Sequence, residues 1–598
     1  MKRLGLFVFY DKDGIVDDYV VYMIRDLMEN LNHISIISNS KILDKELQKF
    51  HEFTKDITIR ENKGLDAGAL YEYFTTRDDY KEYDEIVILN DTFYGPLYPF
   101  KEVFDNMDKK KNLDFWGMTK GYKQIDGWNE YEDGILPEHL QTFFLVLRNK
   151  VFTSNAFEKY WKQYDIKHMN TFDEVVSKHE TRFTKYLYDN GFEYDSYVQD
   201  SNVDDNPIRN YNNYAYDSST QIINNRAPFL KRKNLVYGYK DMLYYVDNDD
   251  LKKSMEHIKN NTNYDVGMIW KNVLRLYDLD LIKNTYGFYE VVKESNNKIK
   301  STTTAFIKVD NKYNLNILEE KVKYFDKYYL YTSLDEVYNY FNKKKIEITK
   351  INKNFQEVFV KDLDKLDTDY FVFFNFVDDV NAVNLVNITI NDVTIKNLIK
   401  DEKYFSGLLN KLDNNKNIGM AYGPDVINFN NFSKNNNWDN DVIKAIKKIM
   451  PDYKKKINFK KLPVSFSNSF VCKKSVLKTL NLESWQKFEN ETFIKTFSIL
   501  LSYYGTYQSM YPIIVMNENY ALYKLNLMTS MNRETYKNLY KLLSLPADYS
   551  GSLNLLNNMG VKNLIKLTIR KILSKCKRLC LKLFYYPIKD KFKKNDDE

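Results

Sequence analysis

The sequence predicts an α/β protein with more than one domain, and three observations support this. The chain has 598 residues, which is too many for a single hydrophobic core. Its first part alternates short apolar runs with segments whose apolar residues recur at helical spacing. The same alternation starts again in the second half of the chain. Strand–helix alternation with short connections is typical of doubly wound α/β domains, so we predict two of them in tandem.

Six segments of the first domain are predicted strands, because each is a short and mostly apolar run. A continuous run such as LGLFVFY is typical of a strand buried on both faces of a parallel sheet. Apolar residues at helical spacing in DDYVVYMIRDLMENL (17–31) predict the first helix. The predicted strands are LGLFVFY (4–10), HISIISNS (33–40), DITIREN (56–62), EIVILND (85–91), DFWGMT (114–119) and TFFLVLR (142–148).

Changes of pattern divide the chain into four parts. A less regular stretch with a predicted helix at 264–279 follows the first domain, and the alternation then resumes with TTTAFIKVD, KYYLYTS, KIEITKIN and DYFVFFNF. This second region is expected to repeat the architecture of the first, although not its sequence. The predicted parts are an α/β domain at 1–205, a largely helical connecting segment at 206–297, a second α/β domain at 298–545 and a basic tail at 546–598.

The tail carries a predicted amphipathic helix at 561–584. This segment holds eight Lys and Arg residues and no acidic residue, and its apolar residues step by three or four. One apolar stripe against a basic face is typical of a helix that lies on an anionic membrane. A surface helix packed on the protein core is the alternative. The predicted lipid-facing cations include Lys566, Arg570, Lys571, Lys575, Lys577 and Arg578.

Composition narrows the class and the location of the protein. A net charge of +6 does not indicate a nucleic-acid binder. Three cysteines cannot form a disulfide framework, which favours a reducing compartment. The N-terminal apolar run breaks at Asp11 and reads as a strand, and no stretch reaches the ~18 apolar residues of a spanning helix. We therefore expect a cytoplasmic protein, peripheral on the inner face of the membrane.

Polar residues gather where the predicted strands of the first domain end. Each cluster alone is typical of a turn, but ligands bind at the carboxyl edge of such sheets. Four clusters at one edge therefore predict a binding site. They are Tyr10 and Asp11 at the end of the first strand, Arg60, Asn62, Gly64 and Asp66 in RENKGLDAGAL (60–70), Asn90, Asp91 and Thr92 at the end of EIVILND, and His139 and Gln141 before TFFLVLR.

This set of residues suits a nucleotide-sugar donor. A strand-end carboxylate such as Asp91 can hold Mg²⁺ or Mn²⁺ between phosphates, and Arg60 can meet phosphate oxygens. Gly64 and Gly68 allow close backbone approach near a helix start, where amides favour anions. The absence of G-x-x-x-x-G-K-[ST], of G-x-G-x-x-G and of G-x-S-x-G disfavours a P-loop phosphotransferase, a nicotinamide enzyme and a serine hydrolase.

Glu180 is the predicted general base. It stands at the start of a predicted helix in SKHETRFTKYLYDNGFEYDSY (177–197), and an acceptor hydroxyl needs a base to become a nucleophile. An acidic residue is also favourable in the first turn of any helix, which is the structural alternative.

Several segments of the first half of the chain together match the pattern of one family. They are RENKGLDAGAL, ILNDTFYGPLYPF, DFWGMT, HLQTFFLVLRNKVFTSNAFEKYW and ETRFTKYLYDNGF, followed by the weaker APFLKRK and YDVGMIWKNVLR. In this order they resemble the rhamnan synthesis protein F family of bacterial cell-wall polysaccharide enzymes. Small departures from the family pattern fall at Leu65, Ala67 and Thr142-Phe143, and they are conservative. The resemblance spans about residues 4 to 280.

The resemblance implies a glycosyltransferase of the GT-A type that uses an activated rhamnose, dTDP-L-rhamnose, as its donor. In that type a strand-end Asp-x-Asp holds metal and diphosphate, and a later acidic residue is the base. Asn90-Asp91-Thr92 and Glu180 stand at these two places. One carboxylate in the first motif leaves the need for a divalent cation open.

The second domain is expected to be a degenerate glycosyltransferase-like domain that binds acceptor or supports the first. Its segments INKNFQEVF (351–359) and FFNFVDD (373–379) have lost the family's phosphate-binding features. The alternative is transfer of a different sugar, with Asp378 or Asp379 at the strand end.

The sequence thus predicts a sugar transferase acting on a lipid-linked glycan. Asp91 would organise the donor diphosphate, directly or through metal, and Glu180 would deprotonate the acceptor. The remaining roles are a donor pocket shaped by Asp66 and Arg60, base contacts from Tyr10 and Asp11, and orientation of sugar or acceptor by His139, Gln141 and Trp116. A non-catalytic glycan-binding scaffold and a phosphoryl- or nucleotidyl-transferring enzyme are the alternatives.

Overall fold

The structure is a computed structural model. It describes residues 1–125, 135–164, 169, 171–199, 219–236, 249–297, 300–312, 315–351, 355–377, 385–424, 440–449, 468–480 and 490–543. The chain divides into two compact units, Met1–Glu518 and Asn519–Glu598. The predicted tail helix at 561–584, with its six cations, lies outside the described residues, as do Asp378 and Asp379.

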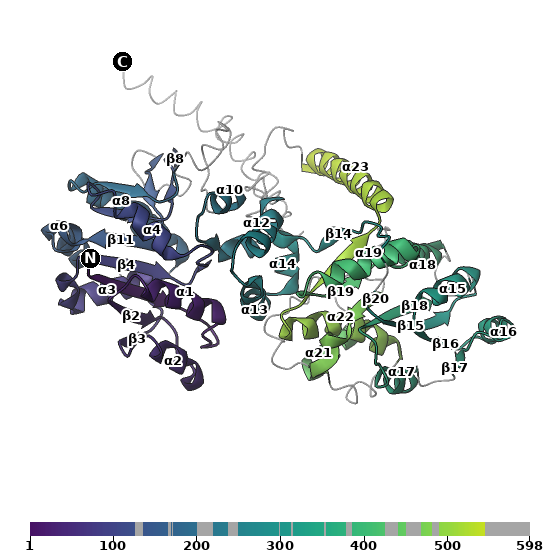
Figure 1. The fold of residues 1–598 in the computed structure, drawn as a ribbon. Helices are drawn as coiled ribbons and strands as arrows, with labels where there is room; N and C mark the ends of the chain where they lie inside the picture. Colours follow the sequence, from purple (N-terminus) through teal and green to yellow (C-terminus); the bar gives the residue numbers. More distant parts are fainter. Residues whose placement is uncertain are drawn as a thin grey trace, which may run out of the picture. The chain divides into compact units, whose positions relative to one another are not determined.

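The first unit contains a seven-stranded sheet with the strand order β12-β6-β11-β4-β1-β2-β3. Figure 1 labels β11, β4, β2 and β3 of this sheet. Neighbouring strands are parallel except for β11, which runs antiparallel to β4 and to β6. All six predicted strands are present, and β12 is added. The strands are β1 (Arg3–Phe9), β2 (His33–Ser38), β3 (Ile57–Ile59), β4 (Glu85–Asn90), β6 (Phe115–Gly117), β11 (Phe144–Arg148) and β12 (Tyr194–Ser196).

Both faces of this sheet are covered, which explains the unbroken apolar run of β1. Phe7 and Phe9 belong to one core cluster with residues of α1 and α4, while Leu6 and Val8 belong to another with residues of α3, α6 and α8. Alternate residues of a strand point to opposite faces, so both sets are buried. The helices of this region are α1 (Asp18–Met28), α2 (Asp44–His51), α3 (Leu65–Thr76), α4 (Phe100–Met107), α5 (Asn149–Phe152), α6 (Asn155–Lys162), α7 (Phe172–Val175) and α8 (Thr181–Asp189).

Short two-stranded ribbons lie beyond the main sheet. They pair β5 (Phe93–Tyr94) with β13 (Leu230–Lys231), β7 (Lys120–Gly121) with β10 (His139–Leu140), and β8 (Gln124–Ile125) with β9 (Ile135–Leu136). The helices that follow are α10 (Ser219–Asn224), α12 (Asp249–Asn261), α13 (Val266–Leu276) and α14 (Leu279–Tyr286). The β5–β13 ribbon matters most, because it joins the end of β4 to a segment far along the chain.

A second sheet repeats the topology of the first. Its order is β14-β21-β19-β20-β18-β15-β16-β17, and β20 is antiparallel to both neighbours, as β11 is in the first sheet. Apart from the additional edge strand β14, strands taken in chain order occupy the same places in both sheets. The strands are β14 (Tyr289–Val291), β15 (Thr303–Asp310), β16 (Lys327–Thr332), β17 (Thr349–Lys350), β18 (Tyr370–Val377), β19 (Ile418–Tyr422), β20 (Phe470–Lys473) and β21 (Tyr511–Met516). The predicted repeat of architecture and the α/β fold class are confirmed.

The helices around the second sheet are α15 (Leu315–Lys321), α16 (Asp335–Lys343), α17 (Phe355–Leu363), α18 (Leu385–Leu398), α19 (Glu402–Asp413), α21 (Asn440–Ile449) and α22 (Asn490–Tyr507), and α23 (Glu518–Leu543) follows them. Among the described residues, no helix is both long enough and apolar enough to cross a membrane.

A buried ion pair fastens the amino end of the first sheet. Glu85 at the start of β4 is fully buried, and its carboxylate accepts from Arg3 Nε at 2.7 Å and from Arg148 Nε at 3.2 Å. Arg3 lies on β1 and Arg148 on β11, so one carboxylate joins three strands.

Replacing Glu85 by Gln should therefore destabilise the protein by roughly 3 kcal/mol, because two guanidinium groups lose their buried counter-charge. The midpoint of thermal unfolding should fall by several degrees. Glu82→Gln is the matched control, since Glu82 is exposed and lies 3.7 Å from Lys2. Equal midpoints for the two variants would contradict the assignment.

Candidate functional site

The carboxyl ends of β4, β1, β2 and β3 form one edge of the first sheet, and most of the predicted site residues follow them. These strands are parallel neighbours, so the loops after them meet at this edge. The structure therefore brings together clusters that the sequence places up to about 80 residues apart.

Asp91 follows β4 and is held in a buried ion pair. It is 5% exposed, and its carboxylate accepts from Arg232 Nη1 at 3.2 Å. The Tyr19 hydroxyl donates to the Asp91 backbone carbonyl at 2.9 Å and accepts from the same Arg232 nitrogen at 3.1 Å. Burial raises the pKa of the Asp91 carboxyl, and the guanidinium counteracts part of that rise.

Asn90 orients a second carboxylate at this edge. Its side-chain amide donates to Asp66 Oδ2 at 3.0 Å, while its carbonyl oxygen accepts from Thr92 Oγ1 at 2.6 Å. Asp66 also accepts from the Ala67 backbone N–H at 3.0 Å at the start of α3. Burial raises the pKa of Asp66, and the nearby Glu180 carboxylate raises it further. The charge of Glu180 therefore acts on Asp66.

Glu180 lies at the end of a π-helical turn, Val176–Glu180, directly before α8. It is half-buried, and Oε2 accepts from Thr142 Oγ1 at 2.9 Å. Turns of this kind often occur at functional sites. Thr142 adjoins Phe143, whose carbonyl accepts from the Asn90 backbone N–H at 3.2 Å, so Glu180 lies near the end of β4. Glu180 also directly precedes α8, as the predicted helix start required.

Arg60 holds the loop that leads into α3, the helix on which Asp66 lies. Its guanidinium donates to Glu72 at 2.6 and 2.8 Å, to Asn39 Oδ1 at 2.6 Å and to the Lys63 carbonyl at 2.8 Å. A Cβ on Gly68 would lie 2.0 Å from that same carbonyl oxygen, so this position requires glycine. The Arg60 side chain is 5% exposed, which fits the predicted shaping role better than a phosphate contact.

Gly64 and Asn62 also lie in the loop between β3 and α3. Gly64 caps α3 with a left-handed backbone (φ 72°), and Asn62 is exposed beside it. Their contacts with a donor stay predictions.

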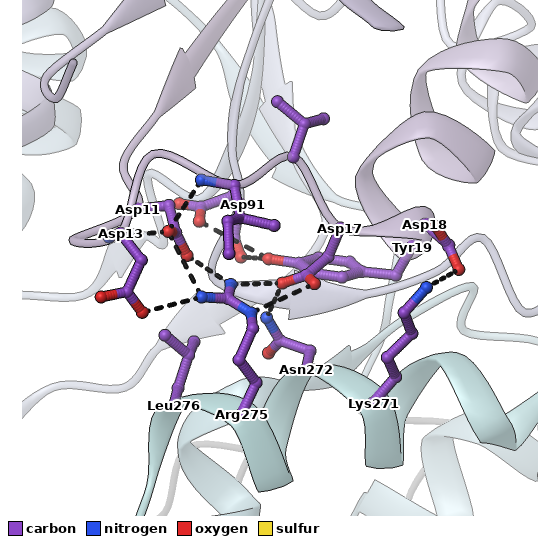
Figure 2. A network of polar contacts seen from close by, with 12 residues as sticks. Asp11, Asp13, Asp17, Asp18, Tyr19, Asp91, Lys271, Asn272, Arg275 and Leu276 are labelled. Atoms are coloured by element: carbon purple, nitrogen blue, oxygen red, sulfur yellow. Dashed lines mark hydrogen bonds and ion pairs between the residues drawn. The ribbon is translucent and has the colours of Figure 1, made fainter. Parts of the chain in front are cut away.

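Asp11 is bound within its own loop and to the connecting segment (Figure 2). Its carboxylate accepts from Arg275 Nη2 at 2.5 Å and from the backbone N–H groups of Asp13 and Ile15 at 2.9 and 3.1 Å. Arg275 also donates to Asp17 at 2.6 Å. The prediction that Asp11 contacts a base is corrected, because this carboxylate organises the loop.

Tyr10 precedes this loop, and its side chain is 44% exposed. Its ring is open to solvent at the end of β1, so a contact between Tyr10 and a base stays a prediction.

Trp116 requires a second correction. It is fully buried and packs against Phe104 and Phe144, with ring centroids 5.8 and 6.0 Å away. A side chain in the core cannot orient a sugar. Its position on β6, at the centre of an apolar layer, explains the aromatic residue instead.

His139 and Gln141 lie in and after the β7–β10 ribbon. Gln141 accepts from Thr119 Oγ1 at 2.6 Å, and His139 Nδ1 lies 2.9 Å from the Pro137 carbonyl oxygen. Both are more than nine-tenths buried. The ribbon is tied to α8, because Leu140 N donates to Thr184 Oγ1 at 2.9 Å. Roles toward a ligand stay predictions for both.

Lys231 is a site residue that sequence reasoning missed. It comes from β13, and Nζ donates to Thr92 Oγ1 at 2.9 Å and lies 3.9 Å from the centre of the Phe143 ring. Burial lowers the pKa of Lys231 to about 7, and the carboxylates of Glu180 and Asp66 act in the opposite direction. The segment APFLKRK was the signal, but its place in space depends on the β5–β13 pairing.

The predicted divalent cation can be tested against the residues at Asp91. No group of three or more His, Cys, Asp or Glu side chains that could hold a metal ion occurs in the part of the chain that the structure describes. The Asp91 carboxylate faces the Arg232 guanidinium. In this arrangement the residues do not fit a cation at Asp91.

Replacing Arg232 by Met should leave Asp91 as an uncompensated buried carboxyl and cost about 3–5 kcal/mol of stability. The raised pKa of Asp91 should rise further, so the loss of stability is larger at pH 8 than at pH 5, where protonation relieves it. Thermal unfolding at both pH values measures this. The double variant with Asp91→Asn should recover part of the loss.

Arg226→Met is the matched control, because that guanidinium pairs with Glu102 at the surface. The absence of any difference between the Arg232 and Arg226 variants would contradict a buried pair.

Comparison with known proteins gives one family and several distant structures. No curated protein matches the chain. Glucosyl-3-phosphoglycerate synthase from Mycobacterium tuberculosis is 11% identical, with 42% of this chain and 82% of that chain covered and a TM-score of 0.23. A structure of the same enzyme with Mn²⁺ and uridine-diphosphate-glucose is 10% identical over 42% and 81% of the two chains, with a TM-score of 0.20.

The glycosyltransferase GlyE of Streptococcus pneumoniae is 10% identical, with 65% of this chain and 89% of that chain covered and a TM-score of 0.21. Likenesses at these TM-scores carry no argument about the reaction. The family model described as rhamnan synthesis protein F matches residues 34–495, which is most of the chain. The chain therefore belongs to the rhamnan synthesis protein F family.

Proposed function

We propose that this protein is a glycosyltransferase that moves rhamnose from dTDP-L-rhamnose onto a lipid-linked cell-wall or surface glycan. Membership of the rhamnan synthesis protein F family supports the class of reaction. The observation that carries the proposal is a chain of contacts at the carboxyl edge of the first sheet, where α/β sheets bind ligands. The Asn90 side chain donates to Asp66 and its backbone N–H donates to the Phe143 carbonyl, while the adjacent Thr142 donates to Glu180.

Glu180 is the proposed base. Its carboxylate takes the proton of the acceptor hydroxyl as that oxygen attacks the anomeric carbon. The bond between that carbon and the donor phosphate oxygen breaks, and nucleoside diphosphate leaves. Thr142 fixes one carboxylate oxygen of Glu180, which leaves the other oxygen for the proton.

The remaining residues position the reactants. Asn90 holds Asp66 toward the site, and Arg60 holds the loop that leads into the helix of Asp66. Asp91 acts through Arg232, whose guanidinium it neutralises and orients. The exposed ring of Tyr10 is available to stack on the donor base.

Glu180→Gln should lower the rate of sugar transfer by about 10²–10⁴-fold with little change in donor KM, because the amide cannot accept the proton. The measurement is nucleoside diphosphate release from a panel of nucleotide sugars that includes dTDP-L-rhamnose, with a membrane fraction as acceptor. Glu158→Gln is the control, since Glu158 is exposed on α6 and pairs with Lys162. A wild-type rate for Glu180→Gln would rule out this base.

The same panel separates the proposal from its alternatives. A glycan-binding scaffold would release no nucleoside diphosphate, and a phosphoryl- or nucleotidyl-transferring enzyme would release phosphate or pyrophosphate. Assays with and without Mn²⁺ report on the need for a cation.

A location on the cytoplasmic face of the membrane is part of the proposal. The basic amphipathic pattern of residues 561–584 supports it. Removing residues 561–598 should move the protein from sedimenting anionic vesicles to the supernatant, whereas neutral vesicles should bind neither form. Unchanged partitioning of the truncated protein would exclude this segment as the membrane contact.

A further inference from the structure

The ammonium group of Lys231 has more hydrogen-bond donors than the described residues use. An ammonium carries three N–H donors, and the contact with Thr92 Oγ1 at 2.9 Å takes one of them. Lys231 is 95% buried, since its exposed fraction is 5%. Buried donors normally find a partner, so two unspent donors in a binding edge indicate a place for a ligand.

The backbone fixes this side chain at the end of β4. Lys231 pairs with Phe93 across the β5–β13 ribbon, and Arg232 N donates to the Thr92 carbonyl at 2.9 Å. At the other end, Leu97 N donates to the Pro228 carbonyl at 2.8 Å. A Cβ on Gly95 would lie 2.4 Å from that oxygen, so glycine allows the close approach. The ring of Phe143 lies under the ammonium and holds it by a cation–π contact.

Charged groups on three parts of the chain act on the ammonium of Lys231. Asp66 at the start of α3 and Glu180 before α8 attract the ammonium, while Arg232 and Lys233 in the following turn repel it. Asp91 neutralises Arg232. Lys231 is thus a buried amine whose charge is favoured by two carboxylates at the edge where the donor is proposed to bind.

We propose that Lys231 binds the diphosphate of the nucleotide-sugar donor and stabilises the charge of the leaving group, with the Asp91–Arg232 pair holding it in place. This inference rests on the proposed glycosyl transfer. As the bond from the anomeric carbon to the phosphate oxygen breaks, the electron pair stays on that oxygen, and the Lys231 N–H groups donate to the phosphate. The acceptor oxygen forms the new bond and gives its proton to Glu180.

This arrangement accounts for the single carboxylate of Asn90-Asp91-Thr92. An Asp-x-Asp pair would bind a metal ion that contacts the phosphates. Here Asp91 binds the guanidinium of Arg232 instead, and the side chain of Lys231 would supply the positive charge for the phosphates. Lysine is suited to this as a compact charge with rotatable donors.

Binding of an anion should be linked to the protonation of Lys231. The pKa of Lys231 is about 7 in the free protein, and a bound diphosphate raises it. Above pH 7 the free lysine must take up a proton in order to bind, so affinity should fall as pH rises, by up to about tenfold per pH unit. The second ionisation of a terminal phosphate has a pKa of about 6, which lies below the pH range in which Lys231 loses its proton.

The test is calorimetric binding of dTDP in EDTA from pH 6.5 to 9, with wild-type protein, Lys231→Met, Lys231→Arg and Lys233→Met. Lys231→Met should weaken binding by about 10- to 100-fold at pH 6.5, the worth of a hydrogen bond to a charged group. Lys231→Arg stays charged, so its affinity should not change between pH 7 and 9. Lys233→Met removes an exposed neighbouring lysine that repels Lys231, so this variant should keep the fall of affinity with pH and move it to slightly higher pH.

The outcomes separate this inference from the proposed function. Wild-type affinity in Lys231→Met, or a wild-type pH slope in Lys231→Arg, would overturn the role of Lys231 while leaving glycosyl transfer in place. Wild-type binding that needs added Mn²⁺ would also overturn it. Failure of the wild-type protein to bind dTDP at any pH would count against both. If Lys231→Met does not fold, the pH profile of Lys231→Arg decides.

Discussion

The ion pair between Asp91 and Arg232 is the interaction on which the candidate site depends. Asp91 ends β4, and Arg232 lies 141 residues further along the chain. Asp91 is buried and Arg232 is largely buried, so each needs the other, and the pair can form only when β13 lies against β5. A buried ion pair is weak evidence for stability, but here it fixes a register. That register sets Lys231 beside Thr92 and completes the edge of the first sheet.

A second set of ion pairs also joins the first sheet to the segment after residue 205, at the loop that follows β1. Arg275 on α13 binds Asp11 and Asp17 in the loop between β1 and α1, and Asn272 on the same helix donates to Asp17 at 2.6 Å (Figure 2). The first sheet thus supplies carboxylates, and the segment predicted as a connection supplies cations. Opposite charges on two parts of the chain specify how they meet. The site therefore includes residues beyond 1–205, where the sequence placed it.

The elements that depend on the pattern of neighbouring residues, such as strands and helices, could be predicted from the sequence. Continuous apolar runs gave the strands of the first sheet, and the alternation of strand and helix placed Asn90 and Asp66 at one edge. Long-range pairings could not be predicted. Lys231 meets Thr92 across 139 positions, and Arg275 meets Asp11 across 264.

The predicted roles of Asp11 and Trp116 are corrected because both side chains are buried in contacts within the protein. An acidic residue at a strand end fits a ligand contact or an internal ion pair equally well, and only the position of Arg275 assigns Asp11 to the second. Trp116 follows the same logic, because an aromatic residue on a short strand can face the core or a ligand. Its packing against Phe104 and Phe144 places it in the core.

The second sheet shows that topology and site chemistry are separable. Its strands repeat the order of the first sheet, so folding requires the same apolar alternation in both. The polar residues differ. At the end of β15, Asp310 pairs with Lys308 on the same strand and accepts from the Ser333 backbone N–H at 2.8 Å. In the first sheet the strand-end carboxylates find their cations on a distant segment, which leaves Lys231 with donors to spare. A charge satisfied within its own strand has less to offer a ligand, and this physical difference favours the first sheet as the place of sugar transfer.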